Sequence, residues 1–305
     1  MTSAAAEPSP TAGYGRGIAM QVLAVALFAC MGMVIKLLDG RYPVSQIILF
    51  RCAPALLPLL LYLPMQGGWS ALKTSRPGWH AVRTVAGLLS MYVGFYAIAR
   101  MAFADYVAIS FTAPLFGTLL SIPLLGERVG IWRAGAVGLG FAGALLTAGP
   151  IAGEADPIAL FALGSAFGYG VAMIAMRKLG STDKSAATVF YFTVAGALSG
   201  LVFVPAHWVA PTPEDLTLLV AIGLIGGVAQ IFMTEAFRLA PPSVVAPFDY
   251  TAMLWALIFG FFVFGTFPSP GVLAGATLIC ASGLFIIHRE TVRGVRRAKL
   301  KSSSL

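Results

Sequence analysis

The chain has 305 residues, of which 58% are hydrophobic and only 10% are charged, and its mean hydropathy is +0.87. Soluble domains contain about 25% charged residues, so this chain lacks the charge that would cover a water-exposed surface. The composition therefore excludes a soluble globular protein and predicts a protein that crosses a membrane several times.

Apolar runs recur along the whole chain, each of about twenty residues, which is the length that crosses a bilayer as a helix. The connections between the runs are short and rich in glycine, proline and charge, and none is long enough to hold a soluble domain. The sequence predicts an all-α fold with ten transmembrane helices: Gly17–Leu37, Val44–Leu63, Trp79–Ala99, Phe103–Leu125, Trp132–Gly149, Pro157–Met176, Ala187–Trp208, Asp215–Phe237, Pro242–Gly265 and Pro270–His288.

Lysine and arginine are distributed unevenly between the two sides of the membrane that ten spans define. Sixteen of the 20 fall on the side that carries both termini, and four lie on the other side or in the spans that lead to it. Because positive charge is retained in the cytoplasm during insertion, we expect both termini to be cytoplasmic in a cell inner membrane. The bias accounts for the net charge of +8 without a nucleic-acid partner. The basic tail then serves as a topology anchor or binds anionic lipid.

The two halves of the chain resemble each other. The segment that begins ARMAFADYVAISF at Ala99 aligns with the segment that begins FRLAPPSVVAPFD at Phe237, and Arg100 then matches Arg238 at a shift of 138 positions. Five spans in each half is an odd number, so the second half must enter the membrane inverted, as in many secondary transporters. The alternative is chance similarity between apolar stretches. The sequence predicts an N-terminal segment at 1–16, repeats at 17–150 and 151–288, and a basic tail at 289–305.

Three stretches resemble a known family. They are ILFRCAPALLP in the second span, RTVAGLLSMYVGFYAIARMAFADYVAISFTAPLFGTLLSIPLLGE in the third and fourth, and EAFRLAPPSVVAPFDYTAMLWALIFGFFVFGT in the second half. The chain resembles an EamA-type exporter of the drug/metabolite transporter superfamily from Gly17 to His288. One departure is Thr266 after Gly265, where the family usually has a glutamate, as the first half does with Glu127.

The resemblance implies a secondary transporter that exports small metabolites, and the aromatic amino-acid exporters of the group fit best. It implies that the substrate is an amino acid with an aromatic or apolar side chain, moved by alternating access. Two alternatives have the same fold: an importer of an S-adenosylmethionine- or nucleotide-like solute, and a broad drug-efflux pump. The partners expected are this substrate and the lipid bilayer, and the sequence leaves open whether the protein is a monomer or a homodimer.

The residues do not indicate an enzyme. The stretch GLGFAG, from Gly138 to Gly143, matches a dinucleotide-binding fingerprint, but it lies inside a span and not where a strand turns into a helix. Close packing of helices through small residues explains it better. The sequence contains neither HExxH nor a Cys/His cluster, so we expect no cofactor and no metal.

Aromatic, methionine and amide side chains at helical spacing suggest where a substrate binds. Tyrosine and tryptophan are the better candidates, because their polar ends are poorly accommodated by acyl chains. Each aromatic could instead face lipid or the interface, and the amide of the eighth span could equally hold helices together. The candidate substrate-binding residues are Tyr92, Phe95, Tyr96, Tyr169, Met173, Gln230, Phe248 and Trp255.

Two charges and two prolines lie within predicted spans. Arg51 and Asp249 are each about 10 Å along a helix, where a charge is costly unless it meets water or a partner. Arg51 either attracts a substrate carboxylate or holds helices together. Asp249 either makes an interhelical hydrogen bond or takes part in proton coupling, with an exposed interfacial position as a third alternative. Pro114 and Pro247 are predicted to bend their helices and are candidates for gating.

Overall fold

The computed structural model describes residues 14–38, 40–126, 130–147, 156–180, 182–205, 207–240 and 242–302. In these ranges the regular elements are helices, which confirms the predicted all-α fold. They are α1 (Tyr14–Leu37), α2 (Val44–Cys52), α3 (Leu56–Tyr62), η1 (Leu63–Gln66), η2 (Gly68–Leu72), α4 (Pro77–Arg100), α5 (Phe103–Ser110), α6 (Ala113–Leu125), α7 (Ile131–Thr147), α8 (Ile158–Leu179), α9 (Ser185–Phe203), α10 (Pro213–Leu239), α11 (Pro242–Val245), η4 (Ala246–Tyr250), α12 (Thr251–Phe262) and α13 (Pro270–Ser302).

Seven helical segments within the described residues are long and apolar enough to cross a membrane. Three shorter apolar helices, Ala134–Thr147, Pro247–Phe262 and Pro270–Ile286, lie where the fifth, ninth and tenth spans were predicted. The last helix differs from the prediction, because α13 continues beyond His288 to Ser302 through the basic tail. The protein is therefore a multi-pass membrane protein built from helices.

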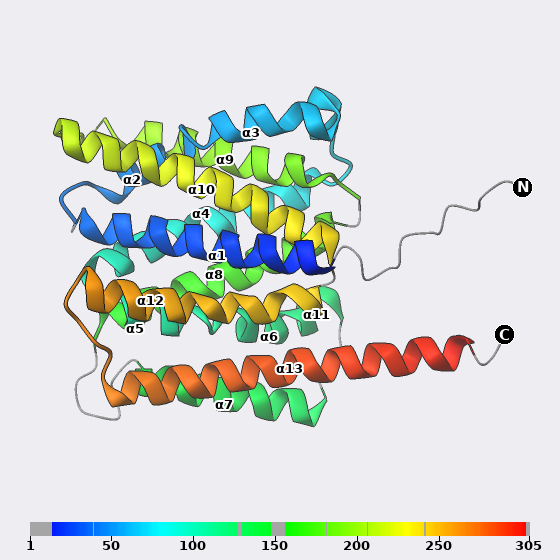
Figure 1. Ribbon diagram of the computed structural model, residues 1–305. Helices are drawn as coiled ribbons and strands as arrows, with labels where there is room; N and C mark the ends of the chain where they lie inside the picture. The colour runs from blue at the N-terminus through cyan, green and yellow to red at the C-terminus, as the bar shows by residue number, and fades with distance from the viewer. Residues whose placement is uncertain are drawn as a thin grey trace, which may run out of the picture.

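The helices lie side by side with roughly parallel axes, and α1 begins at the end of the bundle where α13 finishes (Figure 1). Helices of the first half pack mainly on helices of the second half: α1 on α10, α4 on α8, α2 on α9, α5 on α12 and α7 on α13. The pair α7 and α13 forms one edge of the bundle, and α2, α3, α9 and α10 form the opposite edge (Figure 1).

Small residues allow these helices to approach closely. A Cβ added at Gly94 of α4 would lie 2.5 Å from the Ser165 hydroxyl of α8, and one added at Gly143 of α7 would lie 2.7 Å from the Gly275 carbonyl of α13. Gly143 is the last glycine of GLGFAG, so the packing interpretation of that stretch agrees with its place in the structure.

Three predicted spans are interrupted in the structure. The second divides into α2 and α3 around Pro54, the fourth into α5 and α6 just before Pro114, and the ninth into α11, η4 and α12 around Pro247. Proline removes a backbone hydrogen bond and clashes with the preceding turn, which explains each interruption. The fourth and ninth spans each end near a glycine with positive φ, Gly126 at 68° and Gly265 at 62°. Residues other than glycine rarely adopt this conformation.

Candidate functional site

The interruptions of the fourth and ninth spans meet in the middle of the bundle. The ring centroids of Phe111, between α5 and α6, and Tyr250, at the end of η4, lie 5.1 Å apart with their planes at 69°. The shift of 138 positions that aligns the halves matches Phe111 with Asp249. Both halves therefore bring irregular backbone to the same region, and at this pair of aligned positions the charged residue belongs to the second half. In membrane proteins, such irregular backbone is tolerated where it is buried in protein or lines a cavity.

Asp249 lies on η4 and is joined to the first helix. The side-chain amide of Gln21, which is 2% exposed, donates a hydrogen bond to Asp249 Oδ1. Gln21 Oε1 and the Tyr250 hydroxyl are buried and have no hydrogen-bond partner among the residues that the structure describes. The predicted interhelical hydrogen bond of Asp249 is present, and its donor, Gln21, is a residue that the sequence did not suggest. Polar groups without a partner next to a carboxyl group are suited to binding a small polar molecule.

Arg51 lies on α2, one residue before that helix ends, and is 4% exposed. Its Nη2 donates a long hydrogen bond, 3.4 Å, to the Gly226 carbonyl, and its Nε is buried without a partner. Gly226 allows this approach, because a Cβ there would lie 2.6 Å from Arg51 Nε. Gly227 and Gly223 of the same helix, α10, pack on the interruption between α2 and α3.

Arg83 is a second buried arginine, on α4, and is one of the sixteen basic residues that the sequence predicts on the side of the termini. It is 4% exposed, and its guanidinium carbon lies 3.8 Å from the ring centroid of Phe192 on α9. Its Nε is buried without a hydrogen-bond partner. The depth of Arg83 could have indicated its burial, because the residue lies six residues, or about 9 Å, into a helix that begins at Pro77. Among the described residues, neither Arg83 nor Arg51 has an acidic group within ion-pair distance.

Tyr169 lies near charges of both signs. Its hydroxyl is within electrostatic reach of both Arg83 and Asp249. The side chain is 39% exposed although it comes from α8, which packs on α4 and α6 inside the bundle. Met173 lies one turn further along α8 and is partly buried. The structure thus brings Tyr169, Asp249 and Arg83 together across three helices.

The other predicted aromatics are directed to different neighbours. Tyr92 donates a hydrogen bond of 3.3 Å to Ser199 of α9, whereas Tyr96 packs on Phe161 of α8 with ring centroids 4.9 Å apart. Phe95 is buried and faces a pocket near the end of α4. Although the three share one side of the helix, their contacts are with different neighbours.

The remaining candidates lie on α10 and in the ninth span. Gln230 is buried near the glycines that pack against α2 and α3, a position that favours helix packing. Trp255 is partly buried and stacks on Phe259 with centroids 6.1 Å apart. Phe248 is partly buried in η4, next to Asp249. Pro114 and Pro247 lie at the starts of α6 and η4, where the helices are interrupted.

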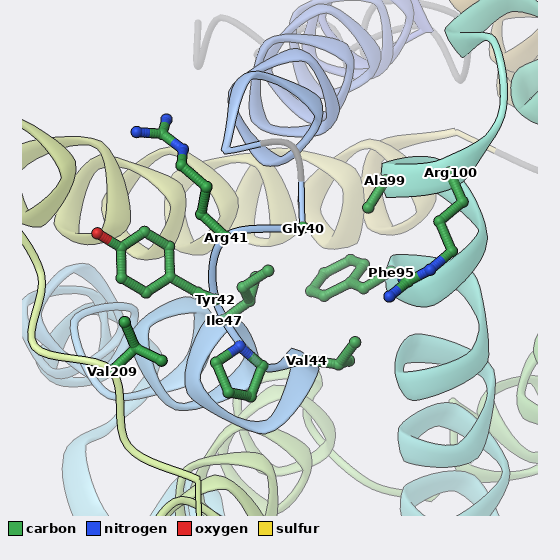
Figure 2. Close-up of a pocket in the computed structure, with 10 residues that line it drawn as sticks. Gly40, Arg41, Tyr42, Val44, Ile47, Phe95, Ala99, Arg100 and Val209 are labelled. Carbon is green, nitrogen blue, oxygen red and sulfur yellow. The ribbon is translucent and has the colours of Figure 1, made fainter.

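A pocket of about 260 Å³ opens at the end of the bundle that lies away from the termini. Figure 2 shows the Phe95 ring extending from α4 toward Ile47, with Arg100 on one side of it. Arg100 stacks on Tyr96, its guanidinium carbon 3.7 Å from the ring centroid. Ile47 of the pocket lies four residues before Arg51, on the same side of α2.

Paired polar groups lie at both ends of the bundle. At the end near the pocket, Arg41 Nη1 lies 2.8 Å from Asp215 Oδ2, and the Tyr42 hydroxyl donates to the same oxygen at 2.7 Å. This hydrogen bond raises the pKa of Tyr42 above its usual value. Gln46 of α2 exchanges two hydrogen bonds with the Val209 backbone. These contacts fasten the start of α2 to the segment that precedes α10.

At the opposite end, His80 Nε2 lies 2.8 Å from Asp183 Oδ2, and both side chains are almost completely buried. Burial alone would raise the pKa of Asp183, but hydrogen bonds from Thr74, His80 and Thr182 outweigh it and hold the pKa below its usual value. This contact fastens the start of α4 to the turn between α8 and α9.

Comparison with known proteins identifies the family. The model of the EamA-like transporter family matches the chain twice, at residues 15–149 and 156–288. The chain belongs to the EamA-like transporter family. A chain of known crystal structure that is 19% identical superposes with a TM-score of 0.63, over 92% of this chain and 99% of its own length, and this likeness concerns the fold alone.

Relatives of this EamA-like chain are transporters with different substrates. An S-adenosylmethionine uptake transporter of Rickettsia conorii is 27% identical over 91% of this chain and 94% of its own length. A riboflavin transporter of Vibrio cholerae is 28% identical, over 85% and 87%. A pseudopaline exporter of Pseudomonas aeruginosa is 31% identical, over 86% and 93%. Family and relatives agree that the chain is a transporter, and the relatives include both uptake and export.

Proposed function

We propose that this EamA-like protein is a secondary transporter that exports amino acids with aromatic or apolar side chains. The observation that carries the proposal is a group of charges in the middle of a transporter-family bundle: Arg51 and Arg83 are buried, and Asp249 is partly buried and accepts a hydrogen bond from Gln21. Ionisable groups within membrane spans are costly and commonly belong to substrate or ion pathways. An amino acid carries a negative and a positive group, and this region offers charges of both signs.

Two inverted repeats of five helices, at 17–150 and 151–288, are the proposed architecture. The family model matches each of these halves separately, which supports the division. The packing pattern supports it as well. The first and third spans are α1 and α4 in the first half, and α8 and α10 in the second half. The third span of the first half packs on the first span of the second (α4 on α8), and the third span of the second half packs on the first span of the first (α10 on α1), as two equivalent halves would. Rocking of one repeat against the other would expose the central region alternately to the two sides.

We propose the inner membrane as the location, with both termini cytoplasmic. The supporting observations are the excess of lysine and arginine on the side of the termini and the arrangement of α1 and α13, whose terminal ends lie together (Figure 1). The pocket beside Phe95 then opens to the outer side. The pair formed by His80 and Asp183 lies on the cytoplasmic side.

Residue roles follow from this arrangement. Tyr169 and Trp255 are proposed to contact the substrate's aromatic or apolar side chain, with their polar ends turned to water or protein. Asp249 is proposed to hold the interrupted ninth helix against α1 through Gln21 and to meet the cationic group that passes during the cycle. The interruptions at Pro114 and Pro247 are proposed as the points at which the two crossing helices bend.

Uptake of a metabolite is a second candidate function. It is supported by the S-adenosylmethionine uptake transporter of Rickettsia conorii, which matches 91% of this chain. S-adenosylmethionine contains an amino-acid group, so the same charged region suits either direction of transport. A broad drug-efflux pump is a weaker candidate, because two buried arginines repel the cationic solutes expected for such a pump.

The test is a flux screen with the purified protein in liposomes. Each of the twenty amino acids and S-adenosylmethionine is supplied as a labelled solute, with and without a pH gradient and without ATP. We expect an aromatic or apolar amino acid to be moved. Strict dependence on ATP hydrolysis, or movement of organic cations alone, would contradict the proposal. Movement of S-adenosylmethionine alone would select the second candidate.

A further inference from the structure

We propose that Arg51 and Arg83 together form an oxyanion subsite that receives the carboxylate of the transported molecule. The inference deepens the proposed function, because it names the substrate group that the centre of the bundle recognises. Only Arg51 was a candidate from the sequence, and the structure adds Arg83 as its partner. The two come from different helices, α2 and α4, and from opposite ends of the bundle.

The two arginines approach the middle of the membrane from its two sides. Arg51 is seven residues, or about 10 Å, from the start of α2, and Arg83 is about 9 Å from the start of α4. Both guanidinium groups interact electrostatically with the side chain of Cys52, which follows Arg51 on α2. Helix α9 passes both: Phe192 lies under Arg83, and a Cβ added to Gly196, one turn further, would lie 2.5 Å from Cys52 Sγ.

Two neighbouring cations without an acidic partner are an unfavourable arrangement in a membrane. Each charge costs about 2.5–3.5 kcal/mol on insertion scales, and the two repel each other. Among the described residues, Arg51 has one long hydrogen bond to a backbone carbonyl, Arg83 has a ring contact, and each has a buried Nε without a partner. An anion that enters between them would relieve the repulsion and use the free donors.

The geometry of Arg83 favours a carboxylate. Stacking on Phe192 holds one face of the guanidinium and leaves the N–H edges available, and these edges match the two oxygens of a carboxylate. Tyr169 is accessible and lies within electrostatic reach of both Arg83 and Asp249. A molecule beside Tyr169 can therefore present a carboxylate to the arginines and a cationic group to the aspartate.

The experiment measures the local potential with charged thiol reagents and does not depend on transport. The three native cysteines, Cys30, Cys52 and Cys280, are free and are replaced by alanine. Tyr169→Cys then places one thiol near charges of both signs. The rates of modification by an anionic methanethiosulfonate, the ethylsulfonate, and a cationic one, the ethyltrimethylammonium, are compared in liposomes.

In this background we expect Arg83→Gln to lower the anionic-to-cationic rate ratio by about tenfold, since removing one nearby charge at low effective dielectric is worth that much. Arg83→Lys, which keeps the charge, should preserve the ratio, and Asp249→Asn should raise it. Arg100→Gln is the matched control: it lies about 25 Å further along the same helix and should change nothing. Arg51→Gln provides a second test if Arg83→Gln does not fold.

The proposal is overturned if neither Arg83→Gln nor Arg51→Gln lowers the ratio, or if the Tyr169→Cys thiol is not modified by either reagent. Its failure is distinguishable from failure of the proposed function. If the protein transports amino acids but the rate ratio does not change when either arginine is replaced, the proposed function stands and the oxyanion subsite is wrong. If the rate ratio falls when an arginine is replaced but the protein transports no amino acid, the oxyanion subsite stands and the proposed substrate is wrong.

Discussion

Charged groups at the ends of the bundle differ from those in its middle. At the two ends, Asp215 and Asp183 each accept hydrogen bonds from partners on a neighbouring segment, and the second pair is almost completely buried. In the middle, Arg51 and Arg83 have no acidic partner among the described residues, and Asp249 is met by the neutral amide of Gln21. The carboxylates at the ends already accept hydrogen bonds from the protein, whereas the charged groups in the middle leave bonding capacity for another molecule.

This difference suggests that the charged groups at the ends serve mainly the stability of the protein and those in the middle serve mainly transport. A satisfied pair at the end of a helix fixes one segment against another, so its removal should lower stability with little effect on the transport of molecules already bound. An incompletely satisfied group in the middle contributes less to holding the fold, so its removal should change transport more than folding. Variants of the two regions test this separation.

The largest effect is expected at Asp249. Asp249→Leu removes the charge and leaves the buried Gln21 amide without its acceptor, so we expect at least a tenfold loss of flux and a stability cost of about 1–3 kcal/mol. Asp249→Asn keeps an acceptor for Gln21 and should restore most of the stability without restoring flux. Thermal unfolding in detergent and liposome flux measure the two quantities.

The control for Asp249 is the aligned position of the first half. Phe111→Leu changes the same point of the other interrupted helix, where no charge is present, and should leave flux within severalfold of wild type. If Asp249→Asn keeps full flux and its pH dependence, Asp249 acts only through its hydrogen bond, and the contrast between the middle and the ends no longer holds for this residue.

The second effect concerns the packing around the same interruption. Gly283 of α13 lies directly against the Tyr250 hydroxyl, and a Cβ there would overlap it. We expect Gly283→Ala to push Tyr250 from its place, lowering stability by about 1–3 kcal/mol, typical of overpacking, and reducing flux severalfold. Adding Tyr250→Phe removes the overlapping oxygen and should recover part of both losses. A Gly283→Ala protein with unchanged flux would separate Tyr250 from the transport pathway.

Much of this fold was predictable from the sequence because it depends on local features. Apolar runs mark the helices, and Pro114 and Pro247 mark two of the three interruptions, since proline acts on its own helix. The protein-facing side of Asp249 was predictable from the small residues in line with it, Ala252, Ala256 and Gly260, two of which are buried. Interruption of the second span at Pro54 was not predicted, although the same rule applies to it.

The partners of the central groups were not predictable in this way. Hydropathy does not tell whether an arginine a few residues into a span extends back to the surface or turns inward, and Arg83 turns inward because Phe192 of α9 lies beside it. Helical spacing places Tyr92 and Tyr96 on one side of α4, but their neighbours, α9 and α8, are set by the tertiary arrangement. Gln21 gave no signal, because a single amide in a span has many uses.

A smaller effect is expected at the end of the bundle beside the pocket. Tyr42 and Arg41 share the same oxygen of Asp215, but Tyr42 is buried and Arg41 is largely exposed. Arg41→Gln should change stability by less than about 1 kcal/mol, since exposed ion pairs contribute little. Tyr42→Phe should lower the melting temperature more, because the buried carboxylate loses a donor. Both variants should keep the flux of a saturating substrate. A larger stability loss from Arg41→Gln than from Tyr42→Phe would place the main contribution in the ion pair.

The smallest effect is expected at Asp183, and it depends on pH. The pKa of Asp183 in the folded protein lies below its usual value because Thr74, His80 and Thr182 donate hydrogen bonds to the carboxylate. A carboxyl group with a depressed pKa contributes stability above its unfolded pKa, about 3.9, and loses that contribution as the pH falls through the lower folded value. The melting temperature of the wild type should therefore drop as the pH falls below about 4.

Asp183→Asn cannot titrate, so it should be less stable than wild type at neutral pH and should show a shallower decline in acid. His80→Gln keeps a donor to the carboxylate and serves as the matched variant: it should retain most of the acid dependence. If Asp183→Asn has the same acid profile as wild type, the decline arises from other carboxyl groups, and this pair does not hold the start of α4 to the turn between α8 and α9.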